Sequence, residues 1–543
     1  MPQKLSRRDR SGDEEPPEAG AFRGQIDTLR LELERTRRQC QKLEDRRDAL
    51  DRLVLQRTAE RERLLHGPEY RLGRTLLDRL HLRKPLLAGE RLLLAAWNRR
   101  EAARLAGDRR SAARAGRRRV LATVCSNFPI YSQTFVYQEL TQLVRRGFDV
   151  RLVYSYADPR DNLHAEFSHL WSARRRLLLH REIHQRDFER YRVSSPDKVD
   201  SLIWKLCNAS GMKREELVQH DNFLQAFSFT RFVESYRPHY LHSYFFYDRS
   251  LMAMIAGYIL GIPRGISCYA DHLLQDYELK VVPLHLELCD VVIATSKRVK
   301  RELLEIAPAA DPDRILVKPN AIDVASYPQA SRTEPGPGGP FRIACVCRIE
   351  PKKGLHYLVD AVARLRDRGR HVALHLVGAP DGNPSGRDCQ LALEQRITDL
   401  DLWGTVHLEG RQDQSGVRGF LALADLFVAP YVETEAGDKD GIPTSLLEAM
   451  ATGLPCLVTD AGSITEVIED GWDGTVVAQR DPVVLADAIE ALMADAASRG
   501  RMGARGAAKV RRRFDVNVCE KAFHERVESI LQGGRRNSNG AEP

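Results

Sequence analysis

Short apolar runs alternate with amphipathic stretches from residue 120 to about residue 531, and this pattern predicts the elements of the fold. The first run, Val120–Cys125, is continuously hydrophobic, which is typical of a strand buried on both faces of a parallel sheet. A helix is predicted over Thr134–Arg145 and a second strand over Phe148–Tyr154. A strand, a helix and a further strand in this order open a doubly wound sheet, so the pattern predicts an α/β fold.

The pattern runs through two blocks, separated by a cluster of Pro and Gly at Pro335–Pro340. We therefore predict a first domain at 120–326, a linker at 327–340, a second domain at 341–531 and a loose tail at 532–543. Each domain is expected to be Rossmann-like, and the two to face a cleft. The further strands are expected at His239–Tyr244, Cys289–Thr295, Phe341–Cys347, Val372–Gly378, Val406–Gly410, Asp425–Pro430, Cys456–Thr459 and Gly474–Val477, and Ile315–Asp323 is expected to be the last segment of the first domain.

Two segments of the first domain carry less information. Residues 158–235 are predicted to be helical and polar, and to form an insertion. The apolar run Leu251–Ile262 is too short to span a bilayer and is predicted to be a core helix.

Residues 1–119 follow a different pattern. We expect a disordered tail at 1–20, because that stretch is rich in charge, Pro and Ser. At 21–66 a heptad repeat predicts a coiled coil, and hence a homo-oligomer, although a solitary solvated helix is the alternative. One seam contains Ile26, Leu33, Cys40 and Val54, and the other contains Leu29, Thr36, Leu43, Leu50 and Leu64. Arg47, Arg57 and Arg61 interrupt the repeat.

The positive charge of the chain is concentrated in this N-terminal region. Residues 1–120 carry 31 Lys and Arg against 19 Asp and Glu, whereas the whole chain has a net charge of only +8, so the rest is slightly acidic. Segment 67–119 mixes Leu and Trp with many Arg and is predicted to be helical. The alternatives are that it lies on an anionic membrane surface or that it packs on the folded domains with its Arg residues in water. Nucleic acid is disfavoured, because aromatic residues are too sparse for base stacking.

Cysteine usage and the chain's first residues indicate a location. The ten cysteines show no paired spacing, and Cys345–Cys347 lacks the two-residue gap of a redox or zinc motif. The polar stretch Pro2–Gly20 does not have the pattern of a signal peptide. We therefore expect a cytoplasmic protein, either free or peripheral at the inner face of the membrane.

The most informative stretch is Asp440–Pro455. Pro443 suits the start of a helix, and Gly453 followed by Pro455 suits its end. An acid thus precedes the helix N-terminus in a Gly-containing loop, and Glu448 lies about one and a half turns inside it. Free backbone N–H groups at such an N-terminus can bind phosphate, while carboxylates can bind sugar hydroxyls. An ordinary capped helix would give the same local pattern.

An acid, seven residues and Glu, followed by Ala-Met-Ala-x-Gly-x-Pro, resembles the nucleotide-sugar signature of the group 1 family of retaining GT-B glycosyltransferases. The Asp-Gly-Ile-Pro form is similar to a subset that makes exopolysaccharide and colanic-acid-type polymers. The resemblance covers about 120–530. It implies that Glu448 binds the nucleotide ribose and that Asp440, where Glu is usual, contacts the donor sugar.

Further motifs of the second domain extend the resemblance. Arg348, five residues before Lys353-Gly354, resembles the family's diphosphate clamp, and two fixed cations beside a helix N-terminus can neutralise a leaving diphosphate without a metal. A surface loop of Arg and Lys is the plain alternative. Donor contacts are also expected from the amides and side chains of Ile442, Pro443, Thr444 and Ser445, and from the turn at Gly378.

In the first domain the motifs depart from the family pattern. Asn127–Phe135 resembles a cleft loop in which Gln133 replaces Glu, and Ser132 and Thr134 are candidate phosphate or acceptor contacts. His242 resembles a His near the active site. Tyr269 stands where relatives have His, which leaves Asp271 and His272 as candidates for the catalytic sugar contact.

The resemblance implies a retaining glycosyltransferase that moves a sugar from a UDP or GDP donor to a glycan or lipid-linked glycan acceptor in cell-surface polysaccharide synthesis. No cofactor or metal is expected. The alternative is a weakened transferase domain that acts as a coiled-coil scaffold of a polysaccharide assembly complex. A GT-B-shaped sugar-nucleotide epimerase is disfavoured by the acidic pair and the Ala-Met-Ala helix.

Overall fold

The computed structural model describes residues 119–538, apart from 129–133, 157–164, 177–180, 236, 247, 270–278, 280, 330–338 and 381–383. These residues belong to one compact unit, 105–543. The predicted tail at 1–20 and coiled coil at 21–66 lie outside the described residues. So does the basic segment at 67–119, except for Arg119, which begins the first strand.

The first domain is built on a seven-stranded parallel sheet with the order β3-β2-β1-β4-β5-β6-β7. Its central strands β4 and β5 are buried at every position, as expected for strands covered on both faces. The strands are β1 (Arg119–Asn127), β2 (Phe148–Tyr156), β3 (Arg174–Arg176), β4 (Tyr240–Tyr244), β5 (Arg264–Cys268), β6 (Val291–Ala294) and β7 (Ile315–Val317).

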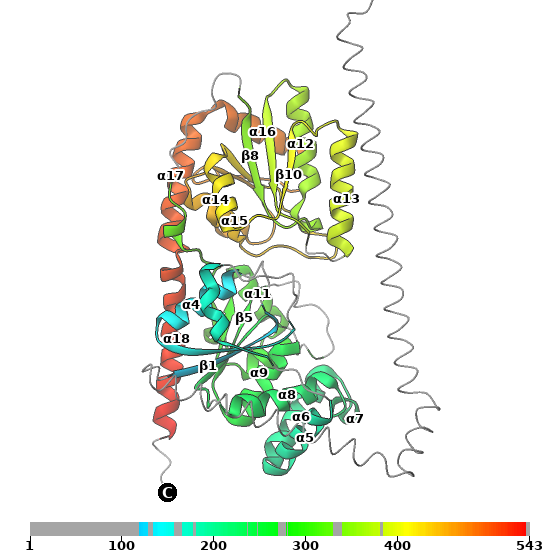
Figure 1. The fold of residues 1–543 in the computed structure, drawn as a ribbon, viewed down its shortest axis with the longest axis vertical. Helices are drawn as coiled ribbons and strands as arrows, with labels where there is room; N and C mark the ends of the chain where they lie inside the picture. Colours follow the sequence, from blue (N-terminus) through cyan, green and yellow to red (C-terminus); the bar gives the residue numbers. More distant parts are fainter. Residues whose placement is uncertain are drawn as a thin grey trace, which may run out of the picture. The chain divides into compact units, whose positions relative to one another are not determined.

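Helices connect successive strands, as in a doubly wound sheet, and 3₁₀ helices complete the connections (Figure 1). The connecting helices are α4 (Thr134–Arg145), α9 (Asp248–Leu260), α10 (Val282–Leu288) and α11 (Lys297–Ile306). The 3₁₀ turns are η1 (Ala165–Ser172), η3 (Pro312–Arg314) and η4 (Val324–Ser326). The predicted core helix at Leu251–Ile262 is confirmed as α9.

The segment predicted to be a polar insertion contains four helices with an apolar core. They are α5 (Arg181–Ser194), α6 (Pro196–Ser210), α7 (Arg214–Leu217) and α8 (Asp221–Glu234). On α8, Phe223, Phe227 and Phe229 are fully buried. Together with residues of α6 and α9 they form one hydrophobic cluster. The description of this segment as polar was therefore wrong for its inner face.

The second domain has a six-stranded parallel sheet with the order β10-β9-β8-β11-β12-β13. This order is that of a dinucleotide-binding doubly wound fold, so the prediction of a second Rossmann-like domain is confirmed. The strands are β8 (Phe341–Val346), β9 (Val372–Val377), β10 (Val406–Gly410), β11 (Leu426–Ala429), β12 (Cys456–Thr459) and β13 (Thr475–Val477).

Helices flank this sheet as well, and α15 coincides with the helix predicted after Pro443. The helices are α12 (Leu355–Asp367), α13 (Pro384–Asp399), α14 (Gln414–Leu423), α15 (Thr444–Ala451), α16 (Pro482–Ala494), α17 (Ala496–Arg513) and α18 (Val516–Ser538). Two 3₁₀ turns, η5 (Pro351–Lys353) and η6 (Ile464–Glu466), lie in its loops.

The last helix returns to the first domain, as Figure 1 shows for α18 beside α4. Phe523 and Val527 of α18 share a hydrophobic cluster with Leu140 of α4. The helix runs to Ser538. It therefore continues past residue 531, where the sequence predicted the domain to end.

Candidate functional site

The carboxyl ends of β8 and β11 adjoin at the point where the strand order of the second sheet reverses. In open α/β sheets, ligands bind outside the carboxyl ends of the strands at such a switch point. The loop after β8 carries the predicted Arg348 and Lys353, and the loop after β11 carries Asp440 before α15. The fold therefore brings together these two motifs, which lie about ninety residues apart in the sequence.

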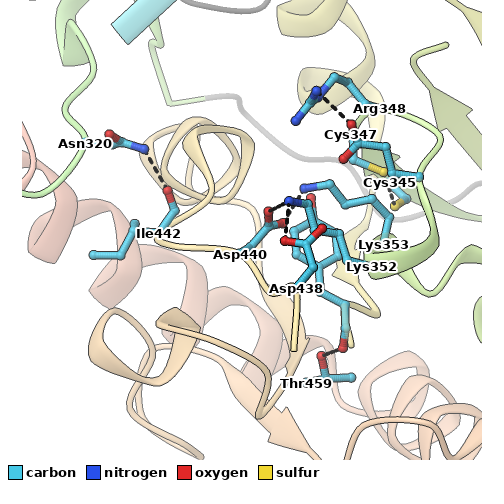
Figure 2. A network of polar contacts seen from close by, with 12 residues as sticks. Asn320, Cys345, Cys347, Arg348, Lys352, Lys353, Asp438, Asp440, Ile442 and Thr459 are labelled. Atoms are coloured by element: carbon cyan, nitrogen blue, oxygen red, sulfur yellow. Dashed lines mark hydrogen bonds and ion pairs between the residues drawn. The ribbon is translucent and has the colours of Figure 1, made fainter. Parts of the chain in front are cut away.

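Lys353 and Asp440 form an ion pair at the centre of this site (Figure 2). The Lys353 ammonium also lies 4.2 Å from the ring centroid of Tyr431, which fixes its direction by a cation–π contact. Both partners are largely shielded from water, with side chains 9% and 15% exposed. The pair is thus placed within the site and is not a surface contact.

A second lysine, Lys352, was not among the predicted site residues. Its Nζ lies 3.1 Å from Asp438 Oδ1 and 3.7 Å from Asp440 Oδ1. Burial would raise the pKa of Asp440, but Lys353 and Lys352 hold it below its ordinary value. Burial likewise opposes the charge of Lys352, yet Asp440 and Asp438 raise its pKa. Asp440 is therefore an ionised, acceptor-only group.

Two glycines allow the loops of the site to approach. Gly378, predicted at a turn, has φ +145°, and a Cβ there would collide with the carbonyl oxygen of Cys347. Gly354 has φ +58°, and a Cβ there would collide with the carbonyl oxygen of Pro430. Only glycine fits both demands. Gly378 thus positions the loop that carries Arg348, and Gly354 the turn that carries Lys353.

Arg348 is more exposed than the lysines. Its Nη1 lies 2.7 Å from Glu350 Oε1, and 40% of its side chain is accessible. Figure 2 shows its guanidinium on the same side of the site as Lys353. The cation that the sequence predicted is therefore available to a ligand without unfolding of the loop.

The N-terminus of α15 completes the site. Pro443 is its N-cap residue in extended conformation, and Thr444 and Ser445 form its first turn. No side chain caps this end, so its first N–H groups point toward the loop. The helix end can therefore bind an anion.

Glu448 lies one turn further along α15 and is 6% exposed. It accepts a hydrogen bond of 2.9 Å from the hydroxyl of Tyr327, which also lies 2.7 Å from Gln414 Oε1. The position of Glu448 agrees with the sequence prediction that it lies about one and a half turns inside the helix. Tyr327, at the predicted start of the linker, was missed because a lone Tyr in such a segment carries no pattern.

Residues of the first domain also contact this loop. Asn320 Nδ2 donates to the carbonyl oxygen of Ile442 at 2.9 Å (Figure 2). The side chain of Ile442 is buried, and its predicted contact with the nucleotide-sugar donor stays a prediction. Asn320 was not among the predicted site residues.

The structure describes only some of the predicted acceptor-side and catalytic residues of the first domain. Thr134 begins α4 and is buried. Ser132, Asp271 and His272 lie outside the described residues. His242 is fully buried between Tyr240 and Ser267, with ring contacts of 3.0 and 2.8 Å. The assignment of His242 to the acceptor surface is corrected: it is a core residue, and burial lowers its pKa to about 4.

Tyr269 takes part in a buried polar network instead of a sugar site. Its hydroxyl donates to Glu139 Oε2 at 2.7 Å, and Lys318 Nζ donates to the same hydroxyl at 3.1 Å. Lys318 also pairs with Glu139 at 2.8 Å and with Glu520 of α18 at 2.7 Å. The departure from the family's His therefore has a structural reason.

Two further kinds of feature are absent from the part of the chain that the structure describes. Among the described residues, no group of three or more His, Cys, Asp and Glu side chains is arranged to hold a metal ion. Within the same part of the chain, no helix is long and apolar enough to cross a membrane.

Comparison with known proteins identifies the second domain. Residues 340–495 match the family model described as glycosyl transferases group 1. The chain is 25% identical over 367 residues to a protein named putative colanic acid biosynthesis glycosyltransferase WcaL from Salmonella typhimurium, covering 66% of this chain and 87% of that one. It is 23% identical to the amylovoran biosynthesis glycosyltransferase AmsK from Erwinia amylovora, over 74% of this chain and 98% of that one.

Solved structures with a similar fold cover both domains. The Anabaena protein HepE, crystallised with UDP, superposes with a TM-score of 0.57 at 17% identity, over 76% of this chain and 100% of that one. The apo form of the lipopolysaccharide outer core galactosyltransferase WaaB gives a TM-score of 0.51 at 14% identity, over 76% and 99%. At these identities the likeness establishes the fold alone.

Proposed function

Since this chain is a GT-B protein with a group 1 glycosyltransferase domain, we propose that it transfers a sugar from a UDP or GDP donor, with retention of configuration, to a glycan or lipid-linked glycan in exopolysaccharide synthesis. The observation that carries the proposal is the Lys353–Asp440 pair at the start of α15, with Glu448 one turn further along. The glycosyltransferases WcaL and AmsK, named for colanic acid and amylovoran synthesis, support the substrate class.

The diphosphate of the donor would lie between Arg348, Lys353 and the first turn of α15. Cations and helix N–H groups bind phosphate oxygens strongly where water is excluded. Lys353 now pairs with Asp440, so it would exchange this carboxylate for a phosphate oxygen on donor binding. Lys352 keeps Asp440 ionised after the exchange, since it pairs with the same carboxylate.

The two acids would bind the rest of the donor. Glu448, which already accepts from Tyr327, would accept hydrogen bonds from the ribose hydroxyls. Asp440 would accept hydrogen bonds from hydroxyls of the sugar. Because its pKa is held below the ordinary value, it serves as an acceptor and does not donate a proton to the reaction.

In the reaction, the acceptor hydroxyl would attack the anomeric carbon on the face from which the diphosphate leaves. The departing phosphate oxygen would take the proton of that hydroxyl, so no carboxylate base is needed. Charge on the leaving diphosphate would be stabilised by Arg348, Lys353 and the N-terminus of α15. This chemistry requires no metal.

The test is thermal-shift binding of UDP, GDP and their sugars in the presence of EDTA. We expect one nucleotide series to raise the Tm by about 5 °C at 100 times its Kd. Glu448→Ala should abolish the rise, whereas Asp399→Ala, an exposed acid of the same domain, should keep it. A wild-type protein that responds to no nucleotide would favour the scaffold function over the transferase.

A second measurement addresses catalysis. Lys353→Ala is expected to lower the rate of nucleoside diphosphate release from the bound donor by about a hundredfold or more, since it removes a cation that stabilises the leaving group. A Lys353→Ala protein that turns over donor at the wild-type rate would disprove the assigned role.

A further inference from the structure

Residues of the first domain contact the loop that carries Asp440, the proposed sugar contact. Lys439 Nζ lies 3.1 Å from Glu302 of α11, and Asn320 donates to the carbonyl of Ile442 at 2.9 Å. Between them, Arg298 of α11 donates through Nη2 to the carbonyl oxygen of Asp440 at 3.1 Å. Three of the four residues 439–442 are thus positioned by contacts with the first domain.

Arg298 makes the most contacts of this group. Besides Asp440, its Nε donates to Ser463 Oγ at 2.9 Å, and its Nη1 donates to Glu302 at 2.8 Å. Only 11% of its side chain is exposed. A planar guanidinium offers these donors in fixed directions, which a flexible ammonium does not.

The second domain binds the same end of α11. Glu466 accepts from the backbone N–H groups of Lys297 and Arg298 at 2.8 and 2.9 Å, which places a carboxylate at the positive end of the helix. Ser463 donates to Ser296, the N-cap residue of α11, at 2.9 Å. The N-terminus of α11 is therefore fixed against the loop after β12.

That loop also lies directly against Asp440. The Ser463 N–H donates to the carbonyl oxygen of Asp440 at 3.2 Å, the same oxygen that Arg298 contacts. Gly462 has φ +61°, and a Cβ there would collide with this carbonyl. The carbonyl oxygen of Asp440 thus accepts one hydrogen bond from each domain.

We propose that Arg298 is a positioning residue of the donor site: from the first domain it holds the backbone of Asp440, so that the acid is in place for the donor sugar only while the two domains are apposed. The inference rests on the proposed function, since it takes Asp440 as the sugar contact. Donor recognition and domain apposition are thereby coupled through one side chain.

The coupling has a direct consequence for binding. The nucleotide is expected to be held by Glu448, Lys353 and α15, all of which belong to the second domain. The sugar is expected to require Asp440 in its observed place. Loss of Arg298 should therefore weaken binding of the nucleotide sugar more than binding of the nucleoside diphosphate alone.

The first experiment needs no ligand. Hydrogen exchange of the full-length protein is compared for wild type, Arg298→Ala and Arg301→Ala, an exposed Arg on the same helix. We expect peptides covering residues 438–445 to exchange about tenfold faster or more in Arg298→Ala alone, since hydrogen bonds to a charged group are lost. Unchanged exchange in this loop would overturn the proposal. Arg298→Lys, which retains one contact, should give an intermediate rate.

The second experiment compares affinities for UDP, GDP and their sugars in the same proteins. Arg298→Ala should keep the affinity for the nucleoside diphosphate within about twofold and lose about tenfold for the nucleotide sugar. An equal loss for both ligands would indicate a purely structural role and overturn the proposal. If Glu448→Ala binds donor like the wild type, the proposed function fails, while the exchange result still decides whether Arg298 holds the loop.

Discussion

At the scale of residues, the site is a balanced set of charges. Arg348, Lys352 and Lys353 face Glu350, Asp438 and Asp440, and every pair lies at or near contact distance. Charges removed from water must be paired to be tolerated. A diphosphate entering this set adds negative charge beside cations that are already desolvated. These ion pairs therefore keep the lysines charged and oriented until a phosphate of the nucleotide-sugar donor takes the place of a carboxylate.

The turn that presents Lys353 can be tested by one methyl group. Gly354→Ala forces a Cβ into the carbonyl of Pro430 at φ +58°, so we expect a loss of about 1–3 kcal/mol in the free energy of unfolding and a weaker affinity for nucleotide. Urea unfolding measures the first quantity. The matched control is Gly369→Ala, which has φ +72° but no atom within 4 Å of the new Cβ. Equal costs at both positions would show that the contact with Pro430 is unimportant.

Sequence reasoning found the site residues whose chemistry is tied to a local pattern. Asp440 and Glu448 have a fixed spacing around a helix start, and Lys353 precedes a Gly that ends a turn. Asp438 and Lys352 lie beside predicted residues, but nothing local distinguishes them from surface charges. Their role depends on two loops about ninety residues apart, and such an approach is visible only in the fold.

At the scale of elements, strands were predicted well because parallel strands buried on both faces are continuous apolar runs. The segment at 158–235 was predicted to be polar from its overall composition. Its inner face is nevertheless apolar, and the ring centroid of Phe227 on α8 lies 4.9 Å from that of Phe188 and 5.1 Å from that of Phe223. Averaging over a helix hides an apolar stripe that covers only one face.

Phe227→Ala tests whether this cluster stabilises the first domain. The ring is fully buried, so we expect a loss of about 3–5 kcal/mol in the free energy of unfolding. Trp204→Ala on α6 is the control, because that side chain is 64% exposed and should cost less than about 0.5 kcal/mol. Chemical unfolding monitored by circular dichroism measures both. A Phe227→Ala cost close to that of Trp204→Ala would mean that the four helices contribute little to stability.

At the scale of the whole molecule, α18 joins the second domain to the first through buried charge. Lys318, in the loop after β7, lies between Glu139 of α4 and Glu520 of α18. Two carboxylates thus share one ammonium. Burial would raise the pKa of Glu139, but Lys318 holds it at about 2. Burial raises the pKa of Glu520 to about 7, more than Lys318 lowers it, and Glu139 adds repulsion. Sequence reasoning did not predict these charges, because the three residues are far apart in the chain.

This arrangement predicts how stability depends on pH. Glu520 has an ordinary pKa of 4.5 when unfolded and about 7 when folded, so between these values the folded state binds the extra proton. Its contribution to stability is therefore lost as pH rises from about 4.5 to 7. The imidazoles of His242 and His524, whose pKa values burial lowers to about 4, act in the opposite direction. Only a comparison between two variants isolates the effect of Glu520.

We therefore expect Glu520→Gln to gain about 2–3 kcal/mol in the free energy of unfolding, relative to the wild type, as the pH is raised from 5 to 8. Both proteins retain the same histidines, so their contributions cancel in the difference. Glu525→Gln, on an exposed position of the same helix, should follow the wild type at both pH values. Urea unfolding at the two pH values measures the differences. If the gap between Glu520→Gln and the wild type stays constant, Glu520 does not titrate in this range, and the ionised carboxylate is fully stabilised by Lys318. A growing gap would mean that the contact between α18 and the first domain weakens when Glu520 loses its proton, so that pH acts on the junction through which the two domains are joined.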